Sequence, residues 1–567
     1  MTFTLIAVVA GFWGCNSSST ESSNNPAKPN ILLIVVDDMG FSDLGCYGGE
    51  IKTPNVDALP DRGVRFSKFY TSSLCAPTRA MLITGVDNHQ SGLGVMPPNH
   101  TREQYLQPGY EGPINNRVMT IAEVLEAGGY HTYMTGKWHL GHHAKDYPAN
   151  RGFEKSFVFL GGGASHFNNA FPLSSVEIPI TEYVRDLQIV ELPDDFFSTI
   201  NYTDEMISFI SKQKDDAPLF GYLAYTAPHD PLHVTDDYFK EYEGVYDVGY
   251  AQIRQKRLER MKAMGMVAKD VPDNPGTGKF PTWDQLDEGS KKKQARRMEL
   301  YASMIEQMDT NLGRLIETLK QEGRYENTIF IFMSDNGANP KEAWEYAPNT
   351  PESIARDYDN SLENVGTANS FIAQGGAWSE VSNTPFSYFK TTTGEGGIHA
   401  PLIICGPGVQ KRESPVHTVS HVTDLFPTIL DFAGTPRPAS LNGRELAPLY
   451  GVSAKDFLSG SSDIIRDTED SPLCFEMTEN KAIIKGKWKA LMLKPPYVQK
   501  AEWQLFNLET DTGEKNNLAS SNPEKLHELV SDWKKYAKEV GYIEAGQAPL
   551  ILQIGSDKFY SYEPLND

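Results

Sequence analysis

Residues 31–38 read ILLIVVDD, six consecutive apolar residues followed at once by two aspartates. An apolar run of this length without alternation is typical of a strand buried on both faces, as in a parallel sheet covered by helices. Four further runs have the same character, at residues 131–135, 219–225, 328–333 and 402–405. The sequence therefore predicts a large sheet assembled from these segments.

Helical patterns lie between the predicted strands. Residues 119–127 are followed by Gly128 and Gly129, which is a helix stop signal. Residues 301–322 carry one apolar stripe at helical spacing, and Gly323 ends it. Strands that alternate with helices predict an α/β fold, with a mixed but mostly parallel sheet between layers of helices.

The length of 567 residues exceeds what one hydrophobic core usually sustains, so a second domain is expected. We assign residues 30–440 to the large α/β domain. Residues 441–567 form a small α+β domain, with short strands in 482–494 and 503–508 and an amphipathic helix at 524–540. The lysine-rich segment 244–297 is interpreted as exposed helices with a Pro/Gly loop.

The first fourteen residues are apolar and are followed by Cys15 and a polar tract. This arrangement, residues 1–29, resembles a bacterial lipoprotein leader with a flexible tether, in which Cys15 carries a lipid anchor. A plain secretion signal or a misplaced start codon are the alternatives. The expected location is outside the cytoplasm, in the periplasm or anchored to a membrane as a lipoprotein.

Charge and cysteine content exclude several classes of protein. A formal net charge of -22 argues against broad nucleic-acid binding, which needs a basic surface. An anionic substrate can still bind where positive charge is concentrated locally. The five cysteines neither form a disulfide framework nor show zinc-site spacing, and one bridge is left open. They are Cys15, Cys46, Cys75, Cys405 and Cys474.

Polar and ionisable residues lie just after four of the predicted strands. These residues are Asp37 and Asp38, Lys137 and His139, His229, and Asp335 and Asn336. In open α/β sheets, ligands bind in the crevice outside the carboxyl ends of the strands. We therefore predict a functional site where these side chains meet.

Four of the strand-end residues form an oxygen-only set of metal ligands. Asp37, Asp38, Asp335 and Asn336 offer three carboxylates and one amide oxygen, which suits calcium or magnesium and does not suit zinc. An isolated Asp-Asp pair would more often be a turn or a helix cap. The second pair at another strand end favours the metal site.

A short motif then points to a family. Cys75-Ala-Pro-Thr-Arg79, continued by Ala-Met-Leu-Ile-Thr-Gly, resembles the signature of the type I sulfatases, which belong to the alkaline phosphatase-like superfamily. A motif of this length recurs by chance, but here it occurs among the strand-end residues that the family also uses, and in the family's order. Val86 departs from the signature, which often has Arg or Lys there.

The resemblance extends from about residue 29 to residue 544 and is strongest toward bacterial arylsulfatases. It includes the GKWHLG block at 136–141, Ala-Pro-His229, Ser-Asp335-Asn336-Gly and Lys390. It implies an alkaline phosphatase-like fold and a calcium ion, in preference to magnesium, bound by Asp37, Asp38, Asp335, Asn336 and residue 75. It also implies that Cys75 is oxidised to formylglycine (3-oxoalanine) by a formylglycine-generating or anaerobic sulfatase-maturating enzyme.

The same resemblance implies a role for each catalytic residue. The hydrated aldehyde at position 75 is the nucleophile, steadied by Arg79 and deprotonated with help from Asp335. Lys137, His229 and Lys390 surround the sulfate, and His229 and Lys390 are placed to protonate the leaving group. His139 takes the proton that lets the aldehyde reform and sulfate leave.

The expected reaction is hydrolysis of a sulfate monoester, either an aryl sulfate or a related small-molecule or glycan ester, by a monomer. Two alternatives stay open. One is a phosphonate monoester or phosphodiester hydrolase, which would share fold, metal and nucleophile. The other is a non-catalytic binder of sulfated glycans with an unmodified Cys75. Taken singly, Arg79, Lys137 and His139 each have a purely structural interpretation.

Overall fold

The computed structural model describes residues 28–441, 443–546 and 548–565. Its largest element is a nine-stranded sheet. The strands of this sheet are β1 (Asn30–Val36), β2 (Gly63–Phe66), β4 (His131–Lys137), β5 (Lys155–Phe159), β6 (Tyr183–Arg185), β7 (Gln188–Val190), β8 (Leu219–Ala224), β9 (Thr328–Ser334) and β10 (Leu402–Cys405). Their order across the sheet is β2-β10-β9-β1-β8-β4-β5-β6-β7.

The five central strands are parallel, and the outer strands on both sides are antiparallel. This confirms the prediction of a mixed, mostly parallel sheet. Residues 402–405, whose pattern is typical of a parallel strand, instead form β10 antiparallel to β9. Burial on both faces explains the continuous apolar run in either orientation, so the pattern does not report strand direction.

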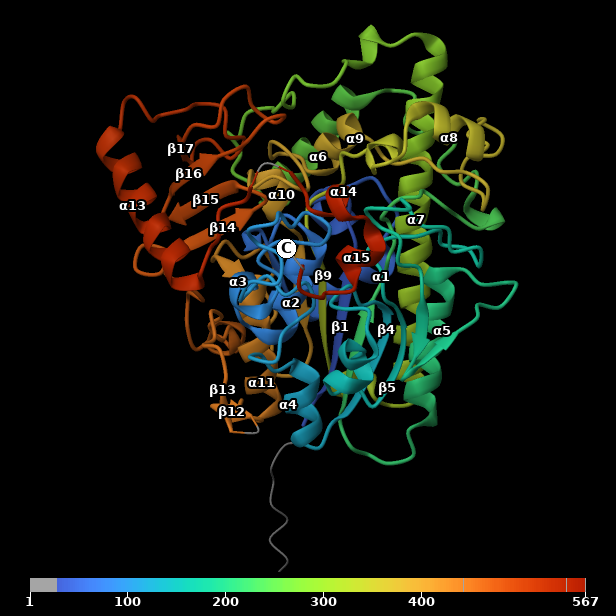
Figure 1. Ribbon diagram of the computed structural model, residues 1–567, viewed down its shortest axis with the longest axis vertical. Helices are drawn as coiled ribbons and strands as arrows, with labels where there is room; N and C mark the ends of the chain where they lie inside the picture. The colour runs from blue at the N-terminus through green and yellow to red at the C-terminus, as the bar shows by residue number, and fades with distance from the viewer. Residues whose placement is uncertain (1–27, 442, 547, 566–567) are drawn as a thin grey trace, which may run out of the picture.

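Helices cover both faces of the sheet (Figure 1). The helices of the large domain are α1 (Pro54–Asp57), α2 (Cys75–Thr84), α3 (Asn88–Ser91), α4 (Ile121–Ala127), α5 (Ser198–Lys212), α6 (Tyr250–Ala263), α7 (Glu288–Gln321), α8 (Pro351–Asp357), α9 (Gly376–Ser382), α10 (Glu395–Ile398), α11 (Leu425–Ala433) and α12 (Lys455–Leu458). Alternate residues of β1 divide between the two cores. Leu32 and Ile34 pack with α5 and α7, whereas Ile31 and Leu33 pack with α2, α4 and α11.

Helix α7 is longer than predicted. The apolar stripe at 301–322 is buried as expected, but the helix begins at Glu288, after an N-cap in which the Asp287 side chain accepts a hydrogen bond from Ser290 N at 2.8 Å. The prediction that residues 244–297 form exposed helices is wrong in part. Arg257 on α6 is fully buried and bonds to Asp43 and Glu50, each at 2.6 Å.

A second, four-stranded antiparallel sheet confirms the small α+β C-terminal domain. Its strands are β14 (Leu473–Met477), β15 (Asn480–Lys485), β16 (Trp488–Met492) and β17 (Gln504–Asn507), and α13 (Pro523–Val540) packs on one face. The boundary at 441 stays a prediction. Phe457 and Leu458 still pack in the core of the large sheet, and β14 begins only at Leu473.

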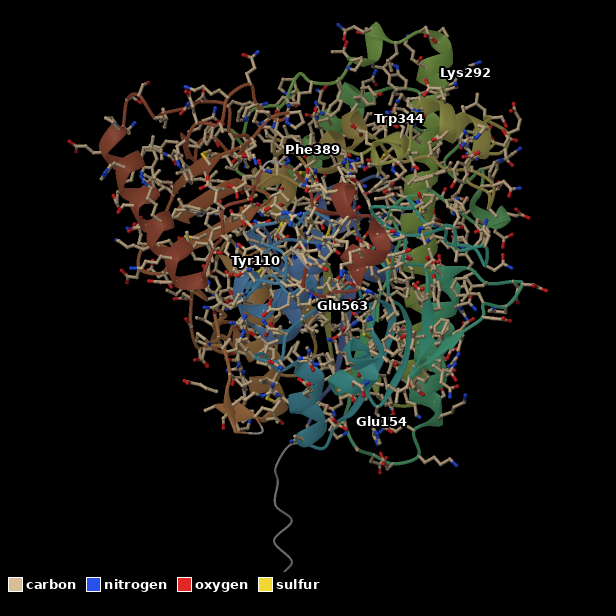
Figure 2. All side chains as sticks on the ribbon, in the orientation of Figure 1. Tyr110, Glu154, Lys292, Trp344, Phe389 and Glu563 are labelled. Carbon is tan, nitrogen blue, oxygen red and sulfur yellow. The ribbon has the colours of Figure 1, made fainter. Side chains whose placement is uncertain are left out.

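The C-terminal segment, residues 548–565, leaves the small domain and crosses the front of the large one, where α14 (Ile551–Ile554) and α15 (Ser556–Tyr560) lie (Figure 1). Figure 2 shows Glu563 of this segment near the middle of the molecule, far from Glu154 at the lower end, just before β5. Short two-residue strands, β3 (Phe69–Tyr70) with β11 (Ser420–His421) and β12 (Ser440–Leu441) with β13 (Arg444–Glu445), complete the described strands.

Two predictions concern cysteines and membranes. Cys46, Cys75, Cys405 and Cys474 are all buried free thiols, so the bridge left open by the sequence does not form among the described cysteines. Cys15 and the rest of the leader lie outside the described residues. Within the described part of the chain, no helix has the length and apolar character needed to cross a membrane.

Candidate active site

The register of the parallel strands brings the predicted residues together at one edge of the sheet. Val36 of β1 pairs with Ser334 of β9, so Asp37 and Asp335 leave the sheet side by side. Asp335 N donates to Val36 O at 3.1 Å, and Asp38 N donates to Asp335 Oδ1 at 3.2 Å. The carboxyl-end crevice predicted from the sequence is therefore where these side chains meet.

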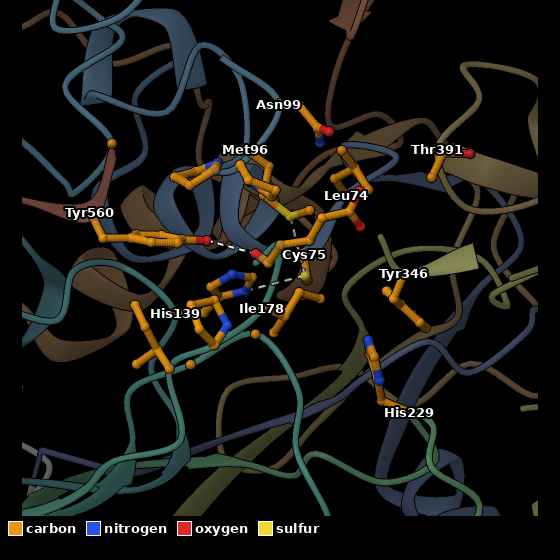
Figure 3. A pocket seen from close by; sticks show the side chains of 18 of the residues that line it. Leu74, Cys75, Met96, Asn99, His139, Ile178, His229, Tyr346, Thr391 and Tyr560 are labelled. Carbon is orange, nitrogen blue, oxygen red and sulfur yellow. Dashed lines mark hydrogen bonds between the residues drawn. The ribbon is translucent and has the colours of Figure 1, made fainter. Parts of the chain in front are cut away.

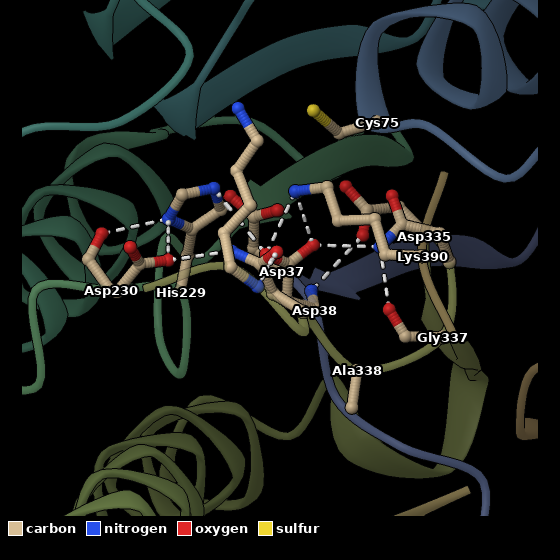
Figure 4. Close-up of polar contacts among 12 residues, drawn as sticks. Asp37, Asp38, Cys75, His229, Asp230, Asp335, Gly337, Ala338 and Lys390 are labelled. Carbon is tan, nitrogen blue, oxygen red and sulfur yellow. Dashed lines mark hydrogen bonds and ion pairs between the residues drawn. The ribbon is translucent and has the colours of Figure 1, made fainter. Parts of the chain in front are cut away.

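Each of three buried carboxylates is paired with a buried cation, and Figure 4 shows one of these pairs, Lys390 with Asp38. These pairs are Asp37 with Lys137 at 2.6 Å, Asp38 with Lys390 at 2.7 Å, and Asp335 with Arg79 at 2.7 Å. The formal charges of the six groups cancel. Removing one partner would leave an uncompensated buried charge, which is strongly destabilising.

Cys75 is the first residue of α2, and its side chain points toward the carboxylates (Figure 4). Its Sγ and one oxygen each of Asp37 and Asp335 lie within 4.8 Å of one another. Because α2 begins at Cys75, the unpaired N–H groups and the positive end of the helix dipole are near this side chain. Arg79, one turn further along α2, reaches Asp335 from the same helix.

Two histidines approach the same point from neighbouring loops. His139 Nδ1 lies 3.3 Å from Cys75 Sγ, and the residue has a left-handed backbone with φ of 56°. His229 follows β8, with Nε2 3.4 Å from Asp38 Oδ2 and Nδ1 2.7 Å from Asp230 O. All the residues predicted to form the site are thus brought together.

Burial and the paired charges shift several pKa values. Burial alone would raise the pKa of Asp37, but Lys137 and then His229 outweigh it and the pKa is lowered. Burial, reinforced by the charge of Asp37, raises the pKa of Asp335. Burial, together with Lys137, lowers the pKa of His139 well below its usual value, so its imidazole is neutral and can accept a proton.

The donor set fits a hard cation. Asp37 Oδ1 and Asn336 Oδ1 are buried acceptors without a hydrogen-bond partner among the described residues. A buried polar atom left unpaired is costly, so these two oxygens indicate a missing ligand. The atoms that could ligate a metal ion are oxygens, which calcium and magnesium prefer. They belong to Asp37, Asp38, Asp335 and Asn336.

Several supporting residues were not predicted from the sequence. Beside His229, Asn339 Nδ2 donates a hydrogen bond to Asp230 Oδ1 at 2.8 Å. The Tyr301 hydroxyl of α7 donates to Asp43 Oδ2 at 2.8 Å and lies 3.2 Å from Asp38 O, and so fixes the loop after β1. Asp230 and Asn339 adjoin the recognised motifs, which is a usable signal. Tyr301 is more than 250 residues from Asp38, and its sequence context indicates only a helix.

Val86, the one departure within the signature, is fully buried in the core near α2. It packs among apolar side chains, so at this position the chain has a core residue in place of a charge.

Comparison with known proteins identifies the family. The sequence model of the family described as Sulfatase matches residues 29–435. The chain belongs to the sulfatase family. This sulfatase is 43% identical over 427 residues to an arylsulfatase of Klebsiella aerogenes, covering 75% of this chain and 91% of that protein. It is also 38% identical over 531 residues to an uncharacterized sulfatase of Schizosaccharomyces pombe, covering 91% and 95% of the two chains.

Solved structures agree on the fold. The crystal structure of Ps i-CgsB has a TM-score of 0.64 with 24% identity, covering 95% of this chain and all of that one. The PsFucS1 sulfatase from Pseudoalteromonas sp. has a TM-score of 0.61 with 18% identity, covering 92% of each chain. The resemblance noted in the sequence is confirmed, and this sulfatase is a sulfuric ester hydrolase.

Proposed function

We propose that this sulfatase hydrolyses sulfate monoesters with Cys75 oxidised to formylglycine and a calcium ion bound by Asp37, Asp38, Asp335 and Asn336. The observation that carries the proposal is the place of Cys75 Sγ within 4.8 Å of the oxygens of Asp37 and Asp335, beside the unpartnered oxygens of Asp37 and Asn336. A soft thiol is a poor neighbour for an oxygen-coordinated cation. Oxidation to an aldehyde and hydration would put oxygen there instead.

A bound calcium ion would supply positive charge that lowers the pKa of a hydroxyl on residue 75 and attracts the sulfate oxygens. We favour calcium over magnesium because four protein oxygens converge there, whereas magnesium usually keeps several waters. Without the ion, the three carboxylates and the three cations Arg79, Lys137 and Lys390 balance. With it, the site would be positively charged and suited to an anionic ester.

The side chains of this sulfatase bind the sulfate and transfer the protons of the reaction. Lys137 and Lys390 are placed to hold the sulfate oxygens, and the N-terminus of α2 adds favourable backbone N–H groups. His229 and Lys390 lie on Asp38 and are placed to protonate the departing oxygen. His139, 3.3 Å from residue 75 and neutral, is placed to take the proton that releases sulfate from residue 75.

The first experiment tests for formylglycine at residue 75 and for dependence on calcium in one preparation. The chain is produced with and without a formylglycine-generating enzyme, and the peptide containing residue 75 is examined by mass spectrometry. We expect the mass loss of thiol-to-aldehyde conversion, turnover of 4-nitrophenyl sulfate only in matured protein, and loss of turnover with a chelator that calcium restores. Full turnover with an intact thiol, or turnover indifferent to the chelator, would overturn the proposal.

The alternatives are tested in the same preparation. A phosphodiester hydrolase would turn over an aryl phosphodiester faster than an aryl sulfate. A non-catalytic glycan binder would keep Cys75 as a thiol even beside the maturation enzyme, and would turn over neither ester. Cys75→Ala is the matched control, since it removes the group to be oxidised.

Export is a separate proposal from the leader sequence. We propose that the apolar run before Cys15 directs the chain out of the cytoplasm, and that Cys15 carries a lipid anchor. Fractionation of a bacterium expressing wild type and Cys15→Ser tests both parts. Lipidation predicts a membrane fraction that Cys15→Ser releases, and a plain secretion signal predicts soluble periplasmic protein from both.

A further inference from the structure

A cavity of about 250 Å³ opens directly above residue 75 (Figure 3). Its floor includes Cys75, His139, His229 and Lys390, so it is the space that the leaving group of a sulfate ester would occupy. For scale, an engineered apolar cavity of roughly 150 Å³ admits benzene. The walls, unlike the floor, are mostly apolar and include Met96, Pro97, Ile178, Pro179, Tyr560 and Tyr562.

Part of the wall comes from the C-terminal segment, residues 548–565. The segment is docked on the large domain rather than on the small one. Leu550 and Phe559 are fully buried in a cluster with Tyr105. Leu550 N donates to His100 O at 2.7 Å, and the Tyr105 hydroxyl donates to Phe559 O at 2.8 Å. These contacts hold the segment across the mouth of the cavity.

Two tyrosines of the segment face the cavity. The Tyr560 hydroxyl donates to Glu177 O at 2.7 Å, and Tyr560 O lies 2.9 Å from His142 Nε2. The Tyr562 ring packs beside His142, with ring centroids 5.3 Å apart. It also covers Gly112, where an added Cβ would lie 2.4 Å from the Tyr562 ring. The ring positions are therefore fixed from both sides.

Most polar side chains of the wall already have partners within the protein. Lys341 Nζ, for example, donates to Glu345 O at 3.3 Å. The Asn99 amide and the Tyr562 hydroxyl are the exceptions, with no hydrogen-bond partner among the described residues. The Tyr346 hydroxyl contacts Asp230 and Asn339, at 3.2 and 2.9 Å. The Tyr497 hydroxyl pairs with Thr391. A sugar ring needs several free donors and acceptors, because hydroxyls buried without partners are costly. A flat apolar ring needs only the apolar and aromatic surface that the wall offers.

Resting on the function proposed above, we infer that the C-terminal segment is a specificity element. A leaving-group subsite for a flat aromatic ring is formed by Tyr560 and Tyr562 of this segment. Met96 and Ile178 complete it from loops of the large domain. The preferred substrates are thus aryl sulfates, and sugar sulfates are disfavoured.

The test compares leaving groups on matured protein loaded with calcium. Wild type, Tyr560→Ala, Tyr562→Ala and a chain ending at Gly546 are assayed with 4-nitrophenyl sulfate and with N-acetylgalactosamine 6-sulfate. Each tyrosine variant should lower kcat/KM for the aryl ester about tenfold, mainly through KM, and the shortened chain roughly a hundredfold. Inhibition by inorganic sulfate, which needs only the floor, should change less than twofold in the two tyrosine variants.

Leu552→Ala is the control, because Leu552 belongs to the same segment and is 57% exposed. It should leave both substrates unaffected. Equal losses on both esters, unchanged kinetics in Tyr560→Ala and Tyr562→Ala, or a wild type that prefers the sugar ester would each overturn the inference. If the matured wild type hydrolyses no sulfate ester, the proposed function itself fails, so the two failures are distinct. The tyrosine variants decide the matter if the shortened chain does not fold.

Discussion

At the scale of single residues, the site depends on where each side chain leaves the backbone. Cys75 begins a helix, Asp37 and Asp335 directly follow strands, and His139 has a left-handed backbone conformation. The strand-end positions of Asp37 and Asp335 were predicted from the sequence, whereas the start of a helix at Cys75 was not. The 3.3 Å approach of His139 to residue 75 was not predicted either, because it depends on how the loop after β4 turns back.

The position of His139 leads to a kinetic prediction. If His139 acts only after the first transfer, His139→Ala should retain a burst of product equal to the enzyme concentration and then turn over roughly 100- to 1,000-fold more slowly. Stopped-flow measurement with 4-nitrophenyl sulfate checks this. His527→Ala on the exposed face of α13 is the control. A burst that is slowed as much as the steady state would contradict the assigned role.

At the scale of elements, a distortion at the end of β4 positions Lys137 in the site. Gly136 has φ of 99° and lies against Ala224 of β8, where an added Cβ would be 1.9 Å from Ala224 O. Only glycine allows this close approach, and the distortion comes directly before Lys137. The ion pair of Lys137 with Asp37 depends on that geometry.

Gly136→Ala should therefore be strongly destabilising, by about 3 kcal/mol or more, because strain and a backbone clash add together. Gly129→Ala is the matched control. Gly129 also has a positive φ, of 83°, but an added Cβ there has nothing within 4 Å, so only the cost of about 1 kcal/mol for φ applies. Urea unfolding of both variants measures the difference, and similar losses would contradict the explanation.

At the scale of the whole molecule, buried charges join the two sheets. His89, in α3, lies 3.0 Å from Asp87 and 2.9 Å from Glu476 of β14. Tyr536 of α13 donates to Asp87 at 2.8 Å. Burial alone would lower the pKa of His89, but its hydrogen bonds to Asp87 and Glu476 raise it to about 9.

This network predicts how stability depends on pH. The folded pKa of His89 is raised above its ordinary 6.5, so its contribution is complete below about pH 6.5 and is lost as the pH rises to about 9. The loss should be up to roughly 3 kcal/mol. Urea unfolding at pH 6 and pH 9 should show a larger decline for wild type than for His89→Gln. Parallel declines would contradict the assignment.

Metal removal is a second test at this scale. A ligand that binds only the folded state stabilises it by about 2.7 kcal/mol at a hundredfold excess over its Kd. Calcium should thus raise the Tm of the matured protein by about two degrees, and a chelator should reverse the increase. Asp37→Asn, which removes a charged ligand, should respond much less. An equal response would place the calcium elsewhere.

The sequence by itself determined the α/β fold, the strand-end residues and the family, because short-range patterns carry them. Apolar runs mark buried strands, and motif residues adjoin strand ends that a parallel sheet necessarily brings together. It did not determine the antiparallel direction of β10 or the early start of α7. Nor did it indicate that Arg257 is buried.

Only the tertiary structure decided which residues form the wall of the cavity above residue 75. Tyr560 and Tyr562 are hundreds of residues from Cys75 in the chain, and no periodicity or motif connects them. They reach the cavity because Leu550 and Phe559 pack against an apolar surface of the large domain. Such packing depends on the shape of two surfaces that exist only after folding, and a linear sequence pattern does not encode it directly.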